Sequence, residues 1–348
     1  MSTDTTDDDS RLARHSTRDD PYVEQDEAAE LPLLLHSMGV LRELFGDLVA
    51  AVRPTSVVEI GGEGGLLTRE LLAHAEALDA RVLCVDSAPS AALIELADTT
   101  RLELVRAFSP AAIDELPERA EFVVVDGDHN YAVVVEETRK LLARGDAAGF
   151  PPFVAYHDVC FPWARRDLYY DPSAVDPAGV HEHRFDTGVS VFSHDPIPGG
   201  GMRSRGNYAI AERAGGERNG VRTAIEDAIA DRDDLVLRIV PAVFGLGFLY
   251  PKDAPWAPAV DALLEPLDRS PLLARLERNR LALYMKLLEL QDHGHALARA
   301  YDEDRARFED RYAEVSGENL RLREELAALK DAGRSTAPAP APTAGGPA

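Results

Sequence analysis

The chain has 348 residues, 45% of them hydrophobic, and a formal net charge of -24. This length allows one large domain or two smaller ones, each with a substantial core. The acidity excludes a nucleic-acid surface of clustered Lys and Arg, and it disfavours binding to an anionic membrane.

The chain begins with a polar, acidic segment, residues 1–29, which we expect to be disordered. The first regular elements follow it. The segment contains no apolar stretch of the kind found in signal peptides, and no apolar run in the chain reaches the ~20 residues of a membrane helix. Cys84 and Cys160 have no CxxC or zinc spacing. We therefore predict reduced thiols and a cytoplasmic protein.

From residue 31 onward, apolar residues at helical spacing predict one or two amphipathic helices, and strands then alternate with helices. This alternation predicts an α/β fold, with a doubly wound and mostly parallel sheet. The expected strands are 56–60, 81–86, 102–107, 121–126 and 153–159. The expected helices between and after them are 66–78, 89–100 and 132–145.

Residues 161–219 form a long stretch rich in Gly, Pro and aromatic residues, which we expect to be an irregular lid or insertion. A helix at 221–232 and a C-terminal antiparallel hairpin, 235–251, complete the expected domain, which spans residues 30–265.

Residues 270–331 are expected to form a long helix or coiled coil. Apolar residues fall on positions a and d of one heptad frame, but Asp304, Arg311, Glu318 and Glu325 interrupt position d in the second half. Two interpretations stay open: self-association into a homo-oligomer, or a solvated helix packed on its own domain. The tail, 332–348, has the composition of a Pro/Ala linker.

The first strand-to-helix turn has the sequence VVEIGGEGG, Val57 to Gly65. Glycines there let the backbone approach a ligand, and the helix N-terminus offers free N–H groups. The glycines do not follow the GxGxxG spacing of dinucleotide sites, and acids lie at Glu59 and Glu63. An anionic pyrophosphate is disfavoured beside these acids, whereas a cationic sulfonium or ammonium is favoured. Asp86 ends the second strand, where an acid can accept the hydroxyls of a ribose or cap the next helix.

These residues resemble the class I S-adenosylmethionine-dependent methyltransferases, which have a Rossmann-like fold. Glu59, Gly61 and Gly65 match the first family motif, and Asp86 matches the second. The resemblance implies that Gly61 to Gly65, including Gly62, line the methionine part of the cofactor, and that Asp86 holds its ribose. Where many members carry an acid after the third strand, this chain has VRAFS, with Phe108 and Ser109 near the expected adenine position.

Polar residues end two strands that should be neighbours, in FVVVDGDHNY and FVAYHDV. If the strand order is 3-2-1-4-5, Asp126 and Asp158 can share a hard cation, with His157 as a third ligand; Mg²⁺ or Mn²⁺ suits this set. The layout resembles metal-dependent O-methyltransferases, which implies that Asp126 is catalytic and that His129 is the general base. The alternative is an Asx turn that starts the following helix.

The segment WARRDLYY, directly after the fifth strand, offers candidate substrate residues. Arg165 and Arg166 can hold an anionic substrate, and Tyr169 or Tyr170 can stack on a ring; the alternative is a surface loop whose arginines pair with acids of the chain. We therefore expect methyl transfer to a small-molecule hydroxyl, on a sugar or natural-product scaffold. The alternatives are an NAD(P)-dependent oxidoreductase, or a non-catalytic scaffold that works through the C-terminal helix.

Overall fold

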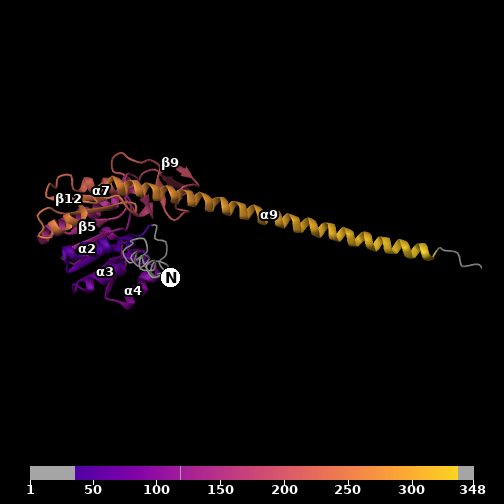
Figure 1. The fold of residues 1–348 in the computed structure, drawn as a ribbon, viewed down its shortest axis with the longest axis horizontal. Helices are drawn as coiled ribbons and strands as arrows, with labels where there is room; N and C mark the ends of the chain where they lie inside the picture. The colour runs from indigo at the N-terminus through magenta and orange to yellow at the C-terminus, as the bar shows by residue number, and fades with distance from the viewer. Residues whose placement is uncertain (1–35, 118, 336–348) are drawn as a thin grey trace, which may run out of the picture. The chain divides into compact units, whose positions relative to one another are not determined.

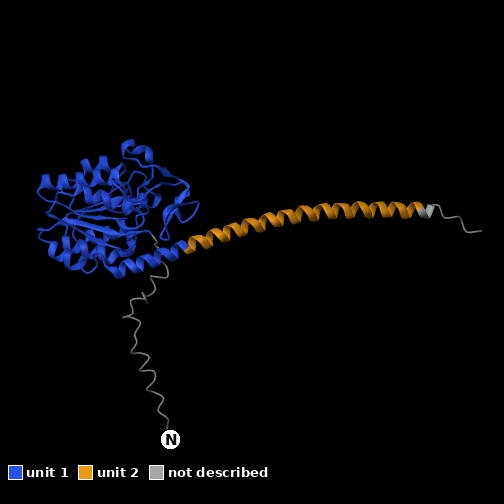
Figure 2. Ribbon diagram, turned by 90° about the horizontal axis from the view of Figure 1, so that it is seen from above, with its two compact units in different colours: residues 1–285 blue, residues 286–348 orange. Residues whose placement is uncertain are grey.

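The computed structural model of the protein describes residues 36–117 and 119–335 (Figure 1). The predictions for residues 1–29 and for the tail beyond Ser335 lie outside these ranges. The chain divides into two compact units, residues 1–285 and 286–348 (Figure 2). The first unit contains the sheet and the lid segment, so the candidate site belongs to it.

A seven-stranded sheet forms the centre of the first unit, in the order β12-β13-β5-β4-β1-β2-β3. Its strands are β1 (Ser56–Ile60), β2 (Arg81–Val85), β3 (Leu102–Val105), β4 (Phe122–Val125), β5 (Phe153–Tyr156), β12 (Leu235–Val240) and β13 (Leu246–Pro251). The first five pair in parallel, and β13 pairs antiparallel with both β5 and β12. This confirms the doubly wound sheet, the 3-2-1-4-5 order and the closing hairpin.

Helices lie on both faces of the sheet. They are η2 (Met38–Leu41), α2 (Arg42–Val52), α3 (Leu66–Glu76), α4 (Ala91–Thr99), α5 (Ser109–Ala112), η3 (Ile113–Glu115), α6 (Tyr131–Ala148), α7 (Val221–Ala228) and α8 (Ala257–Leu264). One core cluster joins α2, α3, α4 and α8 to one face of the sheet, and Figure 1 shows α2, α3 and α4 on the same side. On the other face, Tyr156 of β5 donates a hydrogen bond to Thr138 of α6.

The segment 161–219 is more ordered than the sequence predicts, because short strands pair within it. Two three-stranded antiparallel sheets form here, in the orders β6-β11-β7 and β10-β8-β9. The elements are η4 (Trp163–Arg165), β6 (Leu168–Tyr169), η5 (Pro172–Ala174), η6 (Pro177–Gly179), β7 (His183–Arg184), β8 (Thr187–Ser190), β9 (Ser193–Pro198), β10 (Met202–Arg203) and β11 (Ala209–Ala211). Strands of two to six residues flanked by Gly and Pro give almost no periodic signal, so composition alone predicted a loop.

Asp167 joins this segment to the main sheet unit. Its buried carboxylate accepts hydrogen bonds from the backbone N–H groups of Tyr131 and Gly220, and from the hydroxyl of Tyr169. Tyr131 begins α6 and Gly220 precedes α7, so one negative charge serves two helix N-termini, where anions are stabilising. The start of α6 is thereby fixed next to the end of β4.

Helix α9 (Pro271–Ser335) begins within the first unit. Its residues Glu277, Leu281 and Met285 are buried there, so the unit extends past the boundary expected near residue 265. The long C-terminal helix is confirmed as part of the fold. Across the described residues, no helix combines the length and the apolarity needed to span a membrane.

Candidate functional site

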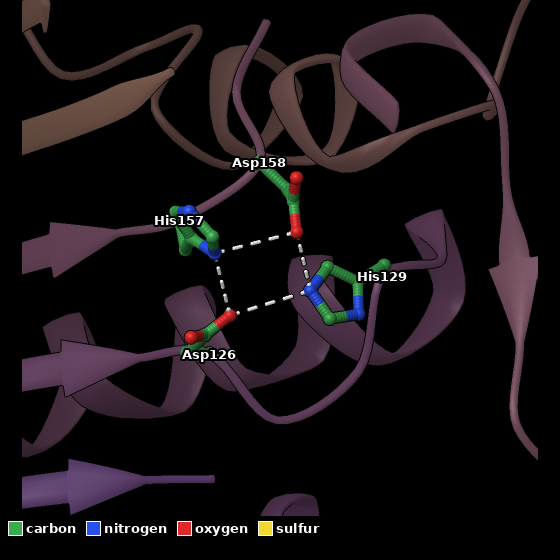
Figure 3. A group of neighbouring side chains, drawn as sticks. All are labelled: Asp126, His129, His157 and Asp158. Atoms are coloured by element: carbon green, nitrogen blue, oxygen red, sulfur yellow. Dashed lines mark hydrogen bonds and ion pairs between the residues drawn. The ribbon is translucent and has the colours of Figure 1, made fainter. Parts of the chain in front are cut away.

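The ends of β4 and β5 bring four polar side chains together (Figure 3). Asp126 follows β4, and His157 and Asp158 follow β5; the parallel pairing of the two strands places these ends side by side. His129 enters from the loop before α6, where Asn130 caps the helix by accepting from the backbone N–H of Val133. The cap keeps the loop tight, so His129 turns back over the strand ends.

The four side chains form a closed ring of short contacts, drawn as dashed lines in Figure 3. Nε2 of His129 lies 2.7 Å from Oδ2 of Asp158 and 3.3 Å from Oδ1 of Asp126. Nδ1 of His157 lies 3.0 Å from the same Asp126 oxygen and 3.4 Å from the same Asp158 oxygen. All four atoms lie within 4.8 Å of one another. The predicted set of Asp126, His157 and Asp158 is thus brought together, with His129 as a fourth member.

The surroundings fix how two of these side chains face the ring. Nε2 of His157 lies 2.8 Å from the carbonyl oxygen of Val243, in the turn between β12 and β13. A carbonyl oxygen can only accept a hydrogen bond, so Nε2 of His157 carries a hydrogen and donates it, and Nδ1 faces the ring. Asp158 has a left-handed backbone, with φ 61°, a region that is uncommon for non-glycine residues and frequent at functional sites.

The electrostatics of the ring are those of buried acid–base pairs. Burial opposes charge on both imidazoles, but the carboxylates of Asp126 and Asp158 outweigh it and raise the pKa of His157 to about 9. Asp158 likewise raises the pKa of His129 well above its usual value, against the effect of burial. Burial alone would raise the pKa of Asp126, but the two imidazolium groups hold it below its usual range. Without an added cation, the two carboxylates therefore favour the protonated form of both imidazoles.

The glycine-rich turn after β1 lies directly against the end of β4. A Cβ at Gly61, whose φ is +86°, would lie 2.3 Å from the carbonyl oxygen of Asp126. A Cβ at Gly62 would lie 2.6 Å from Sγ of Cys84, and Gly65 begins α3 with a left-handed backbone. These glycines let the turn approach β4 and β2 closely, so a ligand held by the turn lies next to the ring of acids and histidines.

Asp86 lies at the end of β2 and faces this turn. Its carboxylate accepts from the backbone N–H groups of Gly62 and Glu63, at 3.0 and 3.1 Å, and from that of Ala88 at 2.8 Å. Two carboxylate oxygens offer about four acceptor sites, so Asp86 keeps capacity for ribose hydroxyls while it shapes the turn. Its role with a ligand stays a prediction.

Two further acids lie buried beside the candidate cofactor residues. Glu59 of β1 is 2% exposed, and burial raises its pKa to about 8. Ser109 begins α5 and donates a hydrogen bond to Glu137 of α6, whose pKa burial also raises to about 8. Both carboxyls are therefore mainly neutral at pH 7. No local pattern indicates Glu137 as a site residue, because it lies in the middle of a long amphipathic helix.

The candidate substrate residues have partners within the protein. Arg165 forms an ion pair with Glu226 of α7 at 2.6 Å. Arg166 is buried and donates to the carbonyl oxygens of Ala211, Glu212 and His194. Both contacts hold the segment 161–219 in place.

Tyr169 is fully buried, whereas Tyr170 is 53% exposed. Neighbouring residues of a strand point to opposite faces, and here Tyr170 contacts His129, with ring centroids 5.9 Å apart. Tyr208 lies beside Tyr170 at 6.2 Å, and Trp163 lies beside Tyr208 at 6.1 Å. An aromatic group therefore borders the ring at His129, and Tyr170 belongs to it in place of Tyr169.

Comparison with known proteins agrees with this arrangement. Residues 58–159 match the family model described as a methyltransferase domain, and this range runs from β1 through Val159, just after Asp158. None of the curated proteins matches the chain.

Two solved structures illustrate the similarity of the fold. One is the SAH-bound methyltransferase PaMTH1 from Podospora anserina, at 13% identity and a TM-score of 0.39, covering 73% of this chain and 99% of that one. Another is cofactor-bound Rv0187 from MTB, at 16% identity and a TM-score of 0.38, covering 72% and 99%. These scores are too low to carry an argument about activity. Residues 58–159 therefore correspond to a methyltransferase domain, and the strand order and the glycine-rich turn beside Asp86 agree with the fold of class I S-adenosylmethionine-dependent methyltransferases.

Proposed function

We propose that this methyltransferase acts on a hydroxyl group of a small molecule, and that a divalent cation held by Asp126, His129, His157 and Asp158 assists the transfer. The observation that carries the proposal is the orientation of His157. Its Nε2 faces the carbonyl of Val243, so a neutral His157 presents the lone pair of Nδ1 to both carboxylates. A second partner of this kind is typical of metal-binding histidines.

The distances support a shared ion. Ligands about 2.1 Å from a common metal lie about 3.0 Å apart when adjacent and about 4.2 Å apart when opposite, in square or octahedral arrangements. The contacts around the ring run from 2.7 to 3.4 Å, and the four atoms stay within 4.8 Å of one another. Two carboxylates with two imidazoles suit Mn²⁺ or a later transition metal better than Mg²⁺.

The charges support the same conclusion. The two carboxylates favour protonation of both histidines, and a dication would supply the same positive charge in place of the two protons.

In this site the chain mainly orients the two reactants. The turn at Gly61 would hold the cofactor next to Asp126, and Asp86 would hold its ribose. When bound, S-adenosylmethionine supplies an electrophilic methyl group, and the cation lowers the pKa of an acceptor hydroxyl. Alignment of the two groups is worth ~7–11 kcal/mol in favourable cases.

His129 acts as a ligand in this proposal, rather than as the general base expected from the sequence. Its Nε2 completes the ring with Asp126 and Asp158, which is the position of a metal ligand. The exposed ring of Tyr170 beside it supports a flat or cyclic acceptor. The free thiols of Cys84 and Cys160 support the expected cytoplasmic location.

Binding of Mn²⁺ alone tests the metal site, because free Mn²⁺ has an electron paramagnetic resonance signal that is lost on binding. We expect one tight site per chain, and a loss of affinity of at least tenfold in Asp126→Asn. The matched control is Asp128→Asn, since the Asp128 carboxylate accepts from the backbone of His129 outside the ring. Absence of a site in the native protein, or equal losses in both variants, would refute the metal proposal.

Methyl transfer tests the acceptor. Purified protein with labelled S-adenosylmethionine and Mn²⁺ would be offered catechols, sugars and phenols, with matched amines and thiols as controls, and products identified by mass spectrometry. We expect O-methylated products that disappear when the metal is chelated. Transfer to amines or thiols only would overturn the hydroxyl assignment, and undiminished O-methylation under chelation would overturn the metal assistance.

A further inference from the structure

The second compact unit contains a helix whose apolar side chains are exposed. In α9, from Leu297 to the end of the described residues, the large apolar side chains on one stripe are 41–73% exposed. They are Leu297, Tyr301, Phe308, Tyr312, Val315, Leu322, Leu326 and Leu329. A long helix in water is stabilised mainly by packing of an apolar face. We therefore expect this stripe to pack against a partner.

The spacing of the apolar residues along the stripe shows which positions can form the core of a coiled coil. In a single heptad frame, Asp304, Arg311, Glu318 and Glu325 would occupy core positions. A shift of the heptad frame at Tyr301 removes this conflict. The spacing between successive core positions is then four residues from 297 to 301 and four again from 301 to 305. Beyond residue 305 the spacing alternates between three and four. Two successive steps of four are a stutter, a known irregularity of coiled coils.

After the shift, the core positions hold mostly apolar residues. They are Arg305, Phe308, Tyr312, Val315, Asn319, Leu322, Leu326 and Leu329. We call this row of core positions the seam. The four charged residues that interrupted the first frame now lie at position g, on the border of the seam. Leu320 is the one large apolar residue between 302 and 335 that lies off the seam, which provides a control.

Charges on the borders of the seam indicate a parallel pair of identical helices. In a parallel two-stranded coil, position g of one helix faces position e of the next heptad in its partner. Two of these pairs are attractive, each twice by symmetry: Glu318 would face Arg323, and Glu325 would face Lys330, whereas Asp304 would face Glu309 at the start of the seam. The four side chains of the attractive pairs are exposed. Asn319 at position a would meet its own copy, an arrangement that fixes register and favours two strands.

We propose that residues 297–332 form a parallel, in-register, two-stranded coiled coil with a second copy of this chain, with a stutter at Tyr301. The occupant of the apolar stripe is thus the same stripe of another molecule. The coil holds two methyltransferase units in one assembly. The dimer does not depend on the metal site or the acceptor, so it can fail or hold separately from the proposed function.

The mass of the full-length protein in solution tests the dimer. Light scattering should give about twice the 37.9 kDa of one chain at micromolar concentration. Leu326→Glu should raise the dissociation constant at least about 100-fold, because it places two like charges in one core layer. Leu320→Glu, on the same helix but off the seam, should leave the dimer intact. S-adenosylmethionine binding by each variant checks that the first unit remains folded.

The outcomes are decisive in either direction. A monomeric native protein, a trimer or tetramer, or a dimer that tolerates Leu326→Glu would refute the proposal, as would equal disruption by Leu320→Glu. In the single frame Leu326 lies outside the core and Glu325 lies inside it, so a dimer strengthened by Glu325→Leu would refute the stutter.

The parallel direction and the register of the two helices can be tested separately. Cysteines at facing core positions of a parallel, in-register pair come within disulfide reach. Asn319→Cys should therefore cross-link to its copy on mild oxidation, while Leu320→Cys should cross-link far less. A dimer without the Asn319→Cys cross-link would be antiparallel or out of register, and would refute this part of the proposal.

Discussion

Substitution of His129 separates its two possible roles, because loss of a metal ligand weakens metal binding, whereas loss of a general base slows turnover. Nε2 of His129 lies 2.7 Å from Oδ2 of Asp158, inside the ring. We predict that His129→Ala lowers Mn²⁺ affinity at least tenfold, as expected when a ligand is lost. Titration of the variant with Mn²⁺, followed by paramagnetic resonance, measures this directly.

The control for this prediction is His183→Ala, because Nδ1 of His183 interacts with the carbonyl oxygen of His181, within the segment 161–219. That variant should bind Mn²⁺ like the native protein. Unchanged Mn²⁺ affinity in His129→Ala, accompanied by slow turnover, would restore the general-base assignment made from the sequence.

Two neighbouring tyrosines should respond in opposite ways to substitution. Tyr170 is half exposed beside His129, so Tyr170→Ala should raise KM for the acceptor several-fold with little change in melting temperature. Tyr169 is fully buried and bonded to Asp167, so Tyr169→Ala should destabilise the fold by about 3–5 kcal/mol. Thermal melts and steady-state kinetics separate the two effects. A stable Tyr169→Ala with a raised KM would return Tyr169 to the substrate site.

Glu137 should make stability fall as the pH rises. Burial raises its folded-state pKa to about 8 from an ordinary 4.5. Between these values the unfolded chain has lost the proton that the folded protein keeps, so the free energy of unfolding falls by up to about 1.4 kcal/mol per pH unit from this group. Glu137→Gln cannot ionise and should lose that slope.

Melting temperatures at pH 5.5 and pH 8 measure this difference. Glu137→Gln should match the native protein at the lower pH and exceed it at the higher one. Glu136→Gln, at the neighbouring position with an exposed side chain, should show no such divergence. A gain for Glu137→Gln that is equal at both pH values would contradict the assigned titration.

Among the elements, the first turns of α9 support the candidate metal ring through the turn between β12 and β13. Glu277 accepts from the backbone N–H of Phe244 at 2.8 Å, and Arg280 donates to both of its oxygens. Val243 and Phe244 both have left-handed backbones, with φ 49° and 63°, which is unfavourable for Val in particular. The bond from Glu277 therefore helps to keep the Val243 carbonyl facing His157.

We predict that Glu277→Ala lowers Mn²⁺ affinity about tenfold, in the range seen when an outer partner of a metal ligand is lost. Glu277→Gln keeps an acceptor for the Phe244 N–H and should preserve most of the affinity. The test is Mn²⁺ titration of both variants below their melting temperatures. Glu277→Ala with lowered stability but native affinity would show a purely structural role.

The large sheet and the strand-end residues could be predicted from the sequence because their signals are local. Apolar runs end in Asp126 and in His157–Asp158, and the topology of a parallel sheet then brings these ends together. The heptad positions of α9 are equally local, and the single frame predicted from them differs from the proposed frame only after Tyr301.

Other features of the site depend on contacts between distant segments, which no local pattern encodes. The pairing of β6 with β11 decides that Tyr169 points inward and Tyr170 outward. Arg166 resembles a substrate residue in sequence, yet folding places it on three backbone carbonyls. Glu277 reaches its turn from the start of the C-terminal helix.

At the scale of the whole molecule, the boundary between the two units makes a prediction about truncation. Leu281 and Met285 are 3% and 1% exposed, whereas the seam residues beyond them are exposed, so a chain that ends after Met285 should keep its melting temperature, S-adenosylmethionine binding and Mn²⁺ binding. A chain that ends after Arg269 lacks Glu277 and both buried apolar residues, and should melt lower and bind Mn²⁺ more weakly. Calorimetry, metal titration and light scattering on the two truncated chains and the full chain test this. Loss of cofactor binding on removing residues 286–348 would show that the C-terminal helix supports the site itself, whereas a monomer with an intact site would show that it serves assembly.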